Sequence, residues 1–447
     1  MAVNSLTLAR LRAHFRDLGV RQILLKFLSP NDNSKNQVYL GGDLGVVNII
    51  AAGDPIAGTS GSHAQPIFKA SVAMSWLDDE GRLFPAPFAQ LILYPQYPEV
   101  RLSGFLRGAE RARSDVMTVR DAGRVMLFGL TNTGTVIAYA ALADSVLARE
   151  LRDDDGRETV GVFQRVALTV DAKTSDARAR LLTALCRING EGWIDGWALN
   201  SDGTRRSCIA SNCVGVTLES ELGITANGRS DPDFEGWEVK AHTVSRLDRH
   251  RAGVVTLMTP EPTDGFYAIE GAEAFVRHFG YPDRRGREDR LNFGGIHLVG
   301  IENPLTRMTL ALNGFDADSQ KLTDSKGQLA LVSRTGLVAA AWSFAGMLAH
   351  WKRKHARAVF VPALKRKTPT VSYRYGNEVV LAEGTDYIRL LSALASGAVY
   401  YDPGIKVENA STRPKTKRRS QFRVKRAQLD RLYHSSLSTS CCDQESR

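Results

Sequence analysis

Hydrophobic and polar positions divide the chain into two parts of different texture. Up to about residue 175, short runs rich in Val, Ile, Tyr and Phe alternate with polar turn clusters. The clusters at residues 78–81 and 131–134 each lie between two such runs, which is the pattern of a β-hairpin. Many short strands joined by polar turns favour a small barrel or sandwich. We therefore expect a mostly-β N-terminal domain over residues 1–175, beginning with an amphipathic helix within residues 1–19.

Beyond residue 175 the pattern becomes a mixture of helical and strand periodicities. Residues 177–187 and 336–354 are helix candidates, the second because apolar residues recur three or four positions apart. Strand candidates are residues 236–241, 249–258 and 358–362. We expect an α/β domain over residues 176–435, with a mixed central sheet flanked by helices, and a flexible tail over residues 436–447.

The residues best placed for chemistry are Asp233, Glu238 and Lys240, in the spacing Asp-x4-Glu-x-Lys. Alternate side chains of a strand share a face, so Glu238 and Lys240 point the same way, and Asp233 can join them across a short turn at Gly236. Two converging carboxylates repel each other, and a hard divalent cation relieves that repulsion. Next to an ammonium, such a cation suits phosphodiester hydrolysis, because it polarises the phosphoryl oxygen and activates a water.

The same spacing also occurs by chance, and such carboxylates are then simply solvated. The alternative to a catalytic site is therefore an inert cluster in a DNA-binding or structural protein. His242 shares the face of Glu238 and Lys240 if the strand continues, and a histidine in that position is more often structural than catalytic.

The charge distribution points to a polyanionic partner. The net charge is +10, and residues 406–431 alone hold ten basic and two acidic residues. That segment accounts for the basic excess of residues 181–447, which carry 37 basic and 29 acidic residues. A local field of this kind attracts nucleic acid, and the alternative is a solvated tail.

Several functional classes are not indicated by the sequence. No apolar run approaches the roughly eighteen residues of a membrane span, and the first residues lack the continuous apolar stretch of a signal peptide. No Gly-x4-Gly-Lys-[Ser/Thr] motif is present, so we expect no dependence on ATP. The five cysteines are sparse and lack zinc-site spacing, which favours a reducing, cytoplasmic compartment and no bound zinc.

The catalytic segment and its surroundings resemble the PD-(D/E)xK nuclease superfamily. More closely, they resemble the MvaI/BcnI group of Type II restriction endonucleases, relatives of the mismatch-repair nickase MutH. The matching positions are residues 217–219, 222–224, 227, 232–234, 236 and 238–240, with weaker matches downstream. The Leu-Glu-x-x-Leu-Gly element that contains Glu219 is shared with MutH. The resemblance covers roughly residues 180–435, and residues 1–175 have no counterpart in it.

The resemblance implies an α/β restriction-endonuclease-like catalytic domain and a role for each residue of the segment. Asp233 and Glu238 would be ligands of Mg²⁺, and Lys240 would be the catalytic lysine. Glu219 would be an auxiliary catalytic carboxylate on the helix beneath the site, where it orients a water or a ligand.

Contact with DNA requires cations for the phosphates and paired donors for the base edges. The basic C-terminal segment supplies most candidates, and the loop before Phe422 resembles a recognition region of the group. We expect DNA-binding roles for Arg413, Lys415, Lys417, Arg418, Arg419, Arg423 and His297. Secondary candidates are Arg284, Arg285, Arg287 and residues 365–367.

Together these features predict a Mg²⁺-dependent, sequence-specific endonuclease that hydrolyses double-stranded DNA to 5′-phosphate and 3′-hydroxyl ends. As a Type II restriction enzyme it would act with a cognate DNA methyltransferase as functional partner. Two alternatives stay open, a MutH-like strand-nicking endonuclease of DNA repair and a catalytically inert DNA-binding protein. The N-terminal domain would be a second DNA-binding or regulatory module.

Overall fold

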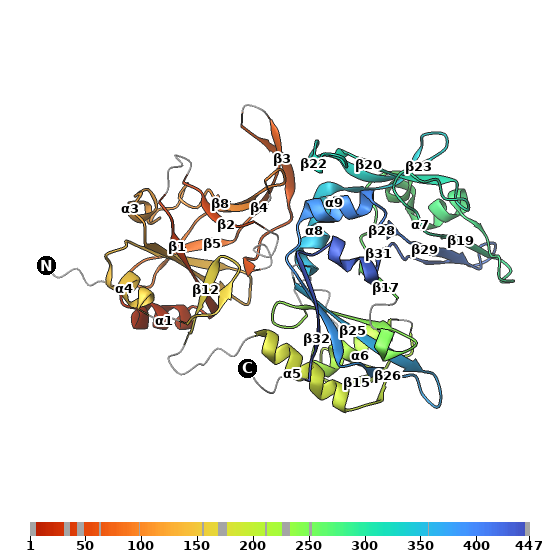
Figure 1. Cartoon of the computed structure of the whole chain (residues 1–447). Coiled ribbons are helices and arrows are strands. Elements are labelled where there is room, and N and C mark those ends of the chain that lie inside the picture. The colour runs from red at the N-terminus through yellow and green to blue at the C-terminus, as the bar shows by residue number, and fades with distance from the viewer. Residues whose placement is uncertain are drawn as a thin grey trace. The chain divides into compact units, whose positions relative to one another are not determined.

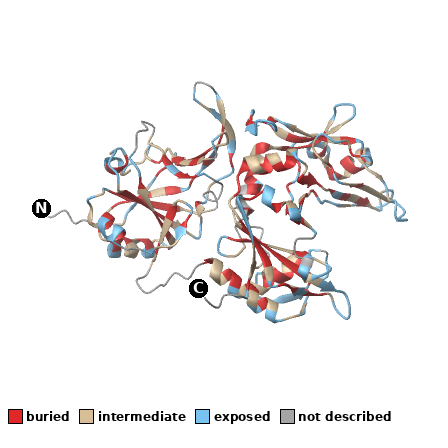
Figure 2. Cartoon of the chain, viewed as in Figure 1, coloured by how far each residue is buried: buried red, intermediate tan, exposed pale blue. Residues whose placement is uncertain are grey.

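The computed structural model describes residues 6–30, 36–42, 49–61, 64–97, 99–153, 156–168, 177–210, 212–225, 233–249, 253–355 and 357–442. The chain divides into two compact units (Figure 1). One comprises Met1–Ile56 and Ile67–Asp176, and the other comprises Ala57–Pro66 and Ala177–Arg447. Buried residues follow the strands of both units, and exposed residues concentrate at their loops (Figure 2).

The first unit is rich in β-structure. Its strands are β1 (Val20–Leu28), β2 (Val38–Gly41), β4 (Gln65–Ser71), β5 (Met74–Leu77), β6 (Leu83–Pro85), β7 (Gln90–Tyr94), β8 (Glu99–Ser103), β9 (Arg124–Thr131), β10 (Val136–Ala141), β11 (Thr159–Val160) and β12 (Phe163–Val166). The strand β3 (Ile56–Ser60) comes between β2 and β4 and, from Ala57 onward, falls in the segment Ala57–Pro66 that is grouped with the other unit. Its helices are α1 (Leu8–Asp17), α3 (Ser114–Met117) and α4 (Val146–Arg152). The strands form a seven-stranded sheet in the order β11-β12-β1-β9-β10-β5-β6 and a five-stranded sheet in the order β2-β8-β7-β4-β3.

Both hairpins predicted in this part of the chain are present. The strands β5 and β6 pair antiparallel around residues 78–81, and β9 and β10 pair around residues 131–134. The helices α1 and α4 cover one face of the seven-stranded sheet, where Phe15 and Leu147 join a core with Ile23 and Leu127 of the strands. The expected β-rich character of the N-terminal region is thus confirmed.

The second unit mixes helices and strands. Its helices are α5 (Ala177–Gly190), α6 (Cys213–Glu221), α7 (Phe266–Phe279), α8 (Phe344–Lys354) and α9 (Tyr387–Ala395), with 3-10 turns at Leu247–Arg249 and Arg426–Arg431. Its strands are β13 (Ile194–Asp195), β14 (Trp197–Leu199), β15 (Arg205–Ser207), β16 (Glu238–Thr243), β17 (Val254–Met258), β18 (Tyr281–Pro282), β19 (Arg290–Gly294), β20 (Met308–Asn313), β21 (Phe315–Asp316), β22 (Lys321–Leu322), β23 (Gln328–Ser333), β24 (Val338–Ser343), β25 (Arg357–Arg366), β26 (Ser372–Tyr375), β27 (Glu378–Glu383), β28 (Val399–Tyr401), β29 (Gly404–Glu408), β30 (Lys415–Lys417), β31 (Phe422–Lys425) and β32 (Ser435–Ser440).

The strand β25 is the centre of a six-stranded mixed sheet (Figure 1). It pairs parallel with β16. It also pairs antiparallel with β27 along its first half and with β26 along its last residues. The strand β13 extends the sheet beyond β26, and β32 extends it beyond β27. One face packs on α5 and α6, where Leu181 and Leu218 share a core with Trp237 and Val359 of the strands. This is the mixed sheet flanked by helices that the sequence predicts.

A second sheet of this unit has the strand order β18-β19-β29-β30. Phe293, Ile405 and Val407 are buried on one of its faces, and the Phe293 ring meets Phe275 of α7 at a centroid distance of 4.6 Å. The other face of this sheet carries charged side chains and is described with the functional site.

The segment expected as one helix over residues 336–354 is a strand followed by a helix. Its first half is β24, which pairs with β23 and buries Ala339, Ala340 and Ala341 completely. The helix α8 begins only after Ser343, whose hydroxyl accepts a hydrogen bond from the Gly346 N–H at 3.1 Å. Alanine has a high helix propensity, but the pairing with β23 overrides it here.

The sequence suggested a flexible tail over residues 436–447, but the described part of it is ordered. Residues 435–440 form β32, which pairs with β27, and Cys441 immediately after it is buried, whereas residues 443–447 lie outside the described residues. A run of serine and threonine lacks the apolar alternation that marks a strand, so only the tertiary pairing defines this one.

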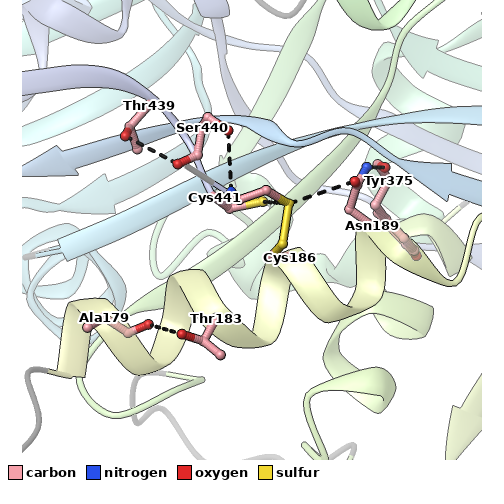
Figure 3. The surroundings of a disulfide bond; sticks show 9 residues. Ala179, Thr183, Cys186, Asn189, Tyr375, Thr439, Ser440 and Cys441 are labelled. Carbon is pink, nitrogen blue, oxygen red and sulfur yellow. Dashed lines mark hydrogen bonds between the residues drawn. A yellow bond between two sulfur atoms is a disulfide. The ribbon is translucent and has the colours of Figure 1, made fainter. Parts of the chain in front are cut away.

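Two disulfides differ from the expectation of reduced cysteines. Cys208 is bonded to Cys213, and Cys186 of α5 is bonded to Cys442 after β32 (Figure 3). The Cα atoms of Cys186 and Cys442 lie 5.0 Å apart although 256 positions separate them in the sequence. This proximity comes from the tertiary fold, so the spacing of the cysteines along the chain could not reveal it.

Within the part of the chain that the structure describes, none of the helices combines the length and the hydropathy required for a membrane span.

Replacing Leu381 with alanine should destabilise the second unit by about 2–5 kcal/mol. Leu381 of β27 is 2% exposed and belongs to the core beside the central sheet, so its truncation leaves a cavity. Denaturation followed by circular dichroism measures the change. Its cross-strand neighbour Leu437 is 49% exposed, and Leu437→Ala should cost only about 0.5 kcal/mol. Equal losses in the two variants would contradict this packing.

Candidate active site

A two-residue turn brings Asp233 beside the start of β16. The turn residues Glu235 and Gly236 have φ values of 45° and 91°, and the residues on either side exchange backbone hydrogen bonds of 2.9 and 2.8 Å. Positive φ at both central positions is the geometry of a type I′ turn. Across the turn, Asp233 Oδ2 accepts the Val239 N–H at 2.9 Å. The carboxylate of Asp233 is therefore held against the first residues of the strand.

The strand β16 presents apolar and polar side chains on opposite faces. Trp237 and Val239 join the core that the sheet shares with α5 and α6. Glu238 is 3% exposed, and its Oε1 accepts a hydrogen bond from Lys240 Nζ at 2.7 Å. The two-residue periodicity of a strand thus places Glu238 and Lys240 together, as it predicts.

Glu219 comes from the last turn of α6. The helix ends at Gly223, whose φ of 76° lets the Ile224 N–H fold back to the Glu219 carbonyl at 2.9 Å, as in a Schellman motif. The side chain of Glu219 interacts electrostatically with both Asp233 and Lys240. The structure therefore brings all four predicted catalytic residues into one cluster.

Three carboxylates around one lysine shift the pKa values of the cluster. Burial and then the negative charge of Glu238 raise the pKa of Asp233 to about 7, with a smaller contribution from Glu219. Burial lowers the pKa of Lys240, but the carboxylates, Glu238 foremost, more than offset this and raise it above its usual value. Lys240 is therefore a charged ammonium at neutral pH, and it does not compensate all of the negative charge around it.

This set of donors fits a divalent cation that is shared between protein and substrate. A small hard cation such as Mg²⁺ is held by one or two carboxylates and completes its shell with water and phosphate oxygens. Asp233 and Glu238 supply two carboxylates. The pKa of Asp233 is raised by burial and then by the negative charge of Glu238, and a cation would offset that charge. Among the described residues, no three His, Cys, Asp or Glu side chains gather closely enough to enclose an ion.

A buried polar layer lies further along the face of Glu238. His242 is 6% exposed and is hydrogen-bonded to Arg426, which is 4% exposed. Burial and the charge of Glu238 raise the pKa of the Tyr433 hydroxyl, which is 3.2 Å from His355 Nδ1. His242 therefore has the structural role that is the commoner one for such a histidine. Sequence reasoning did not single out Arg426, because nothing in its spacing links it to β16.

The β18-β19-β29-β30 sheet has one strongly charged face. Residues directly opposite each other on paired strands share a face, and the register pairs Arg290 with Glu408 and Glu408 with Lys415. In the same way, Asn292 lies opposite Lys406, and Lys406 lies opposite Lys417. We call these six residues the basic sheet face: Arg290, Asn292, Lys406, Glu408, Lys415 and Lys417.

A cavity of about 870 Å³ opens beside the basic sheet face. Besides Arg290, Lys406 and Lys417, its cationic lining residues are Arg284, Arg285, Arg418 and Arg419. Among the described residues that line it, Asp283 is the only carboxylate. Lys406 and Lys417 bind Glu408 at 2.7 and 3.2 Å and hold the pKa of that carboxyl at about 2. The cavity therefore has a strong positive potential.

The structure brings some of the predicted DNA-binding residues together and leaves others apart. Lys417, Arg418 and Arg419 line the cavity, and Lys415 lies on the same sheet face. Arg413 is exposed on the loop before β30. Arg423 is on β31, where its Nη1 forms an ion pair with Asp402 at 2.6 Å.

His297 is placed differently from the DNA contact that the sequence suggested. Its side chain is fully buried, with Nδ1 2.9 Å from the Gly295 carbonyl and Nε2 2.8 Å from the Thr306 hydroxyl. Burial lowers the pKa of His297 to about 4, so the ring is neutral at neutral pH. Both ring nitrogens are engaged inside the protein, which corrects the expectation and removes His297 from the DNA-contact set.

A family model matches residues 182–433, a region that contains both the carboxylate cluster and the basic sheet face. The match identifies the chain as a site-specific deoxyribonuclease of Type II. The matched family is the MvaI/BcnI restriction endonuclease family, and the chain belongs to it.

Solved structures of MvaI restriction endonuclease are similar to part of the chain. The complex of MvaI with its cognate DNA substrate aligns with 59% of this chain and 99% of that chain, at 16% identity and a TM-score of 0.44. MvaI in the absence of DNA aligns with 60% and 99% of the two chains, at 16% identity and a TM-score of 0.32. A comparison with curated protein sequences finds no match.

Asp233→Asn should stabilise the metal-free protein above pH 7 and change little near pH 4. The pKa of Asp233 is raised to about 7 in the folded state, whereas an aspartate in an unfolded chain titrates near ~3.9. Between these pH values the folded state binds one proton more than the unfolded state. The contribution of Asp233 to the free energy of unfolding is therefore fully present below pH ~4, and it is lost as the pH rises through about 7.

Thermal melting in EDTA across this pH range measures the effect of the substitution. The matched control is Asp318→Asn in an exposed loop, for which the melting temperature should stay close to that of the wild type. An Asp233→Asn variant that melts below the wild type at pH 8 would show that the carboxylate is not destabilising when ionised.

Proposed function

We propose that the protein is a Mg²⁺-dependent endonuclease that cuts double-stranded DNA at a specific sequence and leaves 5′-phosphate and 3′-hydroxyl ends. The observation that carries the proposal is the cluster of Asp233, Glu238 and Lys240 at one end of β16, within a chain of a restriction endonuclease family. We assign this cluster to the PD-(D/E)xK type. A cognate DNA methyltransferase that protects the host sites is the functional partner that such an enzyme requires.

Asp233 and Glu238 would hold the metal ion in this proposal. When bound, Mg²⁺ supplies polarisation of the scissile phosphate and activation of the attacking water. The hydrogen bond from the Val239 N–H leaves Oδ1 of Asp233 for an ion, and the turn at Gly236 keeps that oxygen in place. Ligands held on rigid elements in this way need little reorganisation when the ion arrives.

Lys240 acts as an ammonium in this proposal, because the neighbouring carboxylates raise its pKa. It stabilises the negative charge that develops on the phosphoryl oxygens during attack, and its bond to Glu238 at 2.7 Å orients it. Glu219 is the auxiliary carboxylate, which positions Lys240 or a water from the end of α6.

Double-stranded DNA would lie on the basic sheet face and its cavity. Lys415, Lys417, Arg418 and Arg419 are exposed there and are suited to phosphate oxygens, which supply most of the affinity of such interfaces. Arg413 extends this set along the loop. Arg423 needs to exchange its partner Asp402 for DNA before it can take part.

Lys240→Ala should lower the rate of DNA cleavage by about 10²–10³-fold, because the charge of the transition state loses a fixed donor. The measurement is digestion of a mixed-sequence plasmid with Mg²⁺ or with EDTA. Discrete fragments with Mg²⁺ only, lost in the variant, are the expected result, and sequencing of the fragment ends identifies the site.

The matched control is Lys321→Ala, which removes an exposed lysine from β22 and should leave the fragments unchanged. Accumulation of singly nicked circles would favour a strand-nicking repair enzyme instead. Equal activity of the wild type and Asp233→Ala would mean that the carboxylate cluster is inert.

We also propose that residues 1–175 form a second DNA-binding or regulatory module. Arg107 and Arg111 are exposed in this unit and lie over the rings of Phe88 and Phe84, at 4.5 and 5.6 Å from the ring centroids. Neither arginine forms a salt bridge with another residue that the structure describes. Stacking holds a guanidinium in a defined orientation without neutralising its charge, which prepares it for a phosphate.

The double variant Arg107→Ala/Arg111→Ala should therefore bind DNA less tightly, and its affinity should depend less on salt. Each lost phosphate contact lowers the slope of log affinity against log salt concentration by roughly 1, so we expect a decrease of about 2. Fluorescence anisotropy with a duplex at several salt concentrations gives the slope. Arg82 is a control because Asp78 and Glu80 already neutralise it, at 2.7 and 2.9 Å. An unchanged slope together with unchanged cleavage would rule the module out as a DNA contact.

A further inference from the structure

The loop between β18 and β19 is organised around one buried carboxylate. Asp283 Oδ1 accepts the backbone N–H groups of Arg285 and Arg287 at 2.8 and 3.2 Å, and its Oδ2 accepts Asn292 Nδ2 at 3.0 Å. The side chain of Asp283 is 6% exposed. A short acidic side chain thus fixes both the arginine-rich loop and the neighbouring amide on the basic sheet face.

Arg290 is held by the same network. Its Nε donates to Asn292 Oδ1 at 2.9 Å and lies 3.5 Å from Asp283 Oδ2. The side chain is only 19% exposed, and it lines the cavity. Within the ranges that the structure describes, no hydrogen bond or ion pair engages its two terminal amino groups. The guanidinium is therefore anchored at its inner nitrogen and free to donate at its outer edge.

We propose that Arg290 reads the edge of a guanine, with Asn292 and Asp283 as positioning residues. This inference rests on the proposed function, in which duplex DNA occupies the cavity. Two parallel N–H donors match O6 and N7 of guanine in the major groove, and this is the commonest specific contact of arginine with DNA. Phosphate contacts tolerate a mobile cation, but base reading requires a fixed orientation, and Arg290 is fixed.

The contrast with the other cations of the cavity supports this division of roles. Arg284, Arg285 and Arg418 are exposed, and no carboxylate among the described residues forms a hydrogen bond or ion pair with their guanidinium groups. Such side chains suit phosphates, which carry no sequence information. Prior immobilisation of Arg290 also lowers the entropy lost on binding, because the protein has already restricted its rotamers on folding.

The experiment is selection of bound sequences from a randomised duplex library, with Ca²⁺ in place of Mg²⁺, by the wild-type chain and its variants. The variants are Arg290→Ala, Arg290→Lys, Asn292→Ala and Arg418→Ala. The wild type should enrich a defined site that contains guanine. Arg290→Ala should lose roughly 10-fold or more of the preference for guanine at the position that Arg290 contacts, while the other positions keep theirs.

Two variants separate base reading from charge and from folding. Arg290→Lys keeps the charge but not the paired donors, so it should lose the same preference and retain more affinity. Asn292→Ala keeps Arg290 but removes its anchor, so the preference should weaken at the same position. Arg418→Ala should reduce affinity for all sequences alike, as expected for a phosphate contact.

The outcomes also distinguish this inference from the proposed function. Suppose the wild type enriches a site, and Arg290→Ala and Arg290→Lys enrich the same site with undiminished preference for guanine. This result overturns the inference and leaves the proposed function intact. Uniform weakening in both variants assigns Arg290 to a phosphate and likewise overturns it. A wild type that enriches no sequence removes the proposed function, and the inference with it.

Discussion

The repulsion among Asp233, Glu238 and Glu219 is the constraint around which the second unit is built. Asp233 senses the negative charge of both Glu238 and Glu219, all three side chains are at least partly buried, and one ammonium, Lys240, does not compensate them all. Such a cluster persists only if the surrounding backbone holds its members in place. A type I′ turn holds Asp233, a helix end holds Glu219, and a core strand of the central sheet holds Glu238 and Lys240. The stability of the fold therefore supports an arrangement in which neighbouring negative charges are locally unfavourable.

The same unit keeps charge of the opposite sign on a different sheet. The central sheet carries the carboxylates, whereas the β18-β19-β29-β30 sheet carries the basic face and the cationic cavity. On that sheet Asp283 is paired with an arginine and Glu408 with lysines. These two carboxylates orient the cations beside them, and the cations still outnumber them on the surface. Under the proposed function, this separation would let the basic sheet attract DNA while the carboxylate cluster acts on a single phosphodiester bond.

Local sequence patterns predicted the elements that carry the carboxylate cluster and several cations of the cavity, but not the pairing of strands that forms the basic sheet face. The glycines at 223 and 236 mark the end of α6 and the turn before β16, and strand alternation places Glu238 with Lys240. These features depend on a few neighbouring residues. The basic sheet face instead depends on the register between Arg290 and Glu408, which joins distant segments, so sequence reasoning found Lys417 and Arg418 but not Arg290 or Asn292. His297 was misread because its type suggested a DNA contact, while burial among aromatic rings decided its role.

The parallel pairing of β16 with β25 has a bearing on how the protein is made. Glu238 lies opposite Ala358, so the strand that carries the proposed catalytic residues pairs with a strand that is synthesised much later. Long-range parallel pairing forms slowly, because loop closure must precede the contacts that stabilise it. A nascent chain, or a fragment that stops before residue 357, contains Asp233, Glu238 and Lys240 but lacks the strand that orders them. The order of synthesis would thus delay the assembly of the proposed cleavage site until most of the polypeptide exists.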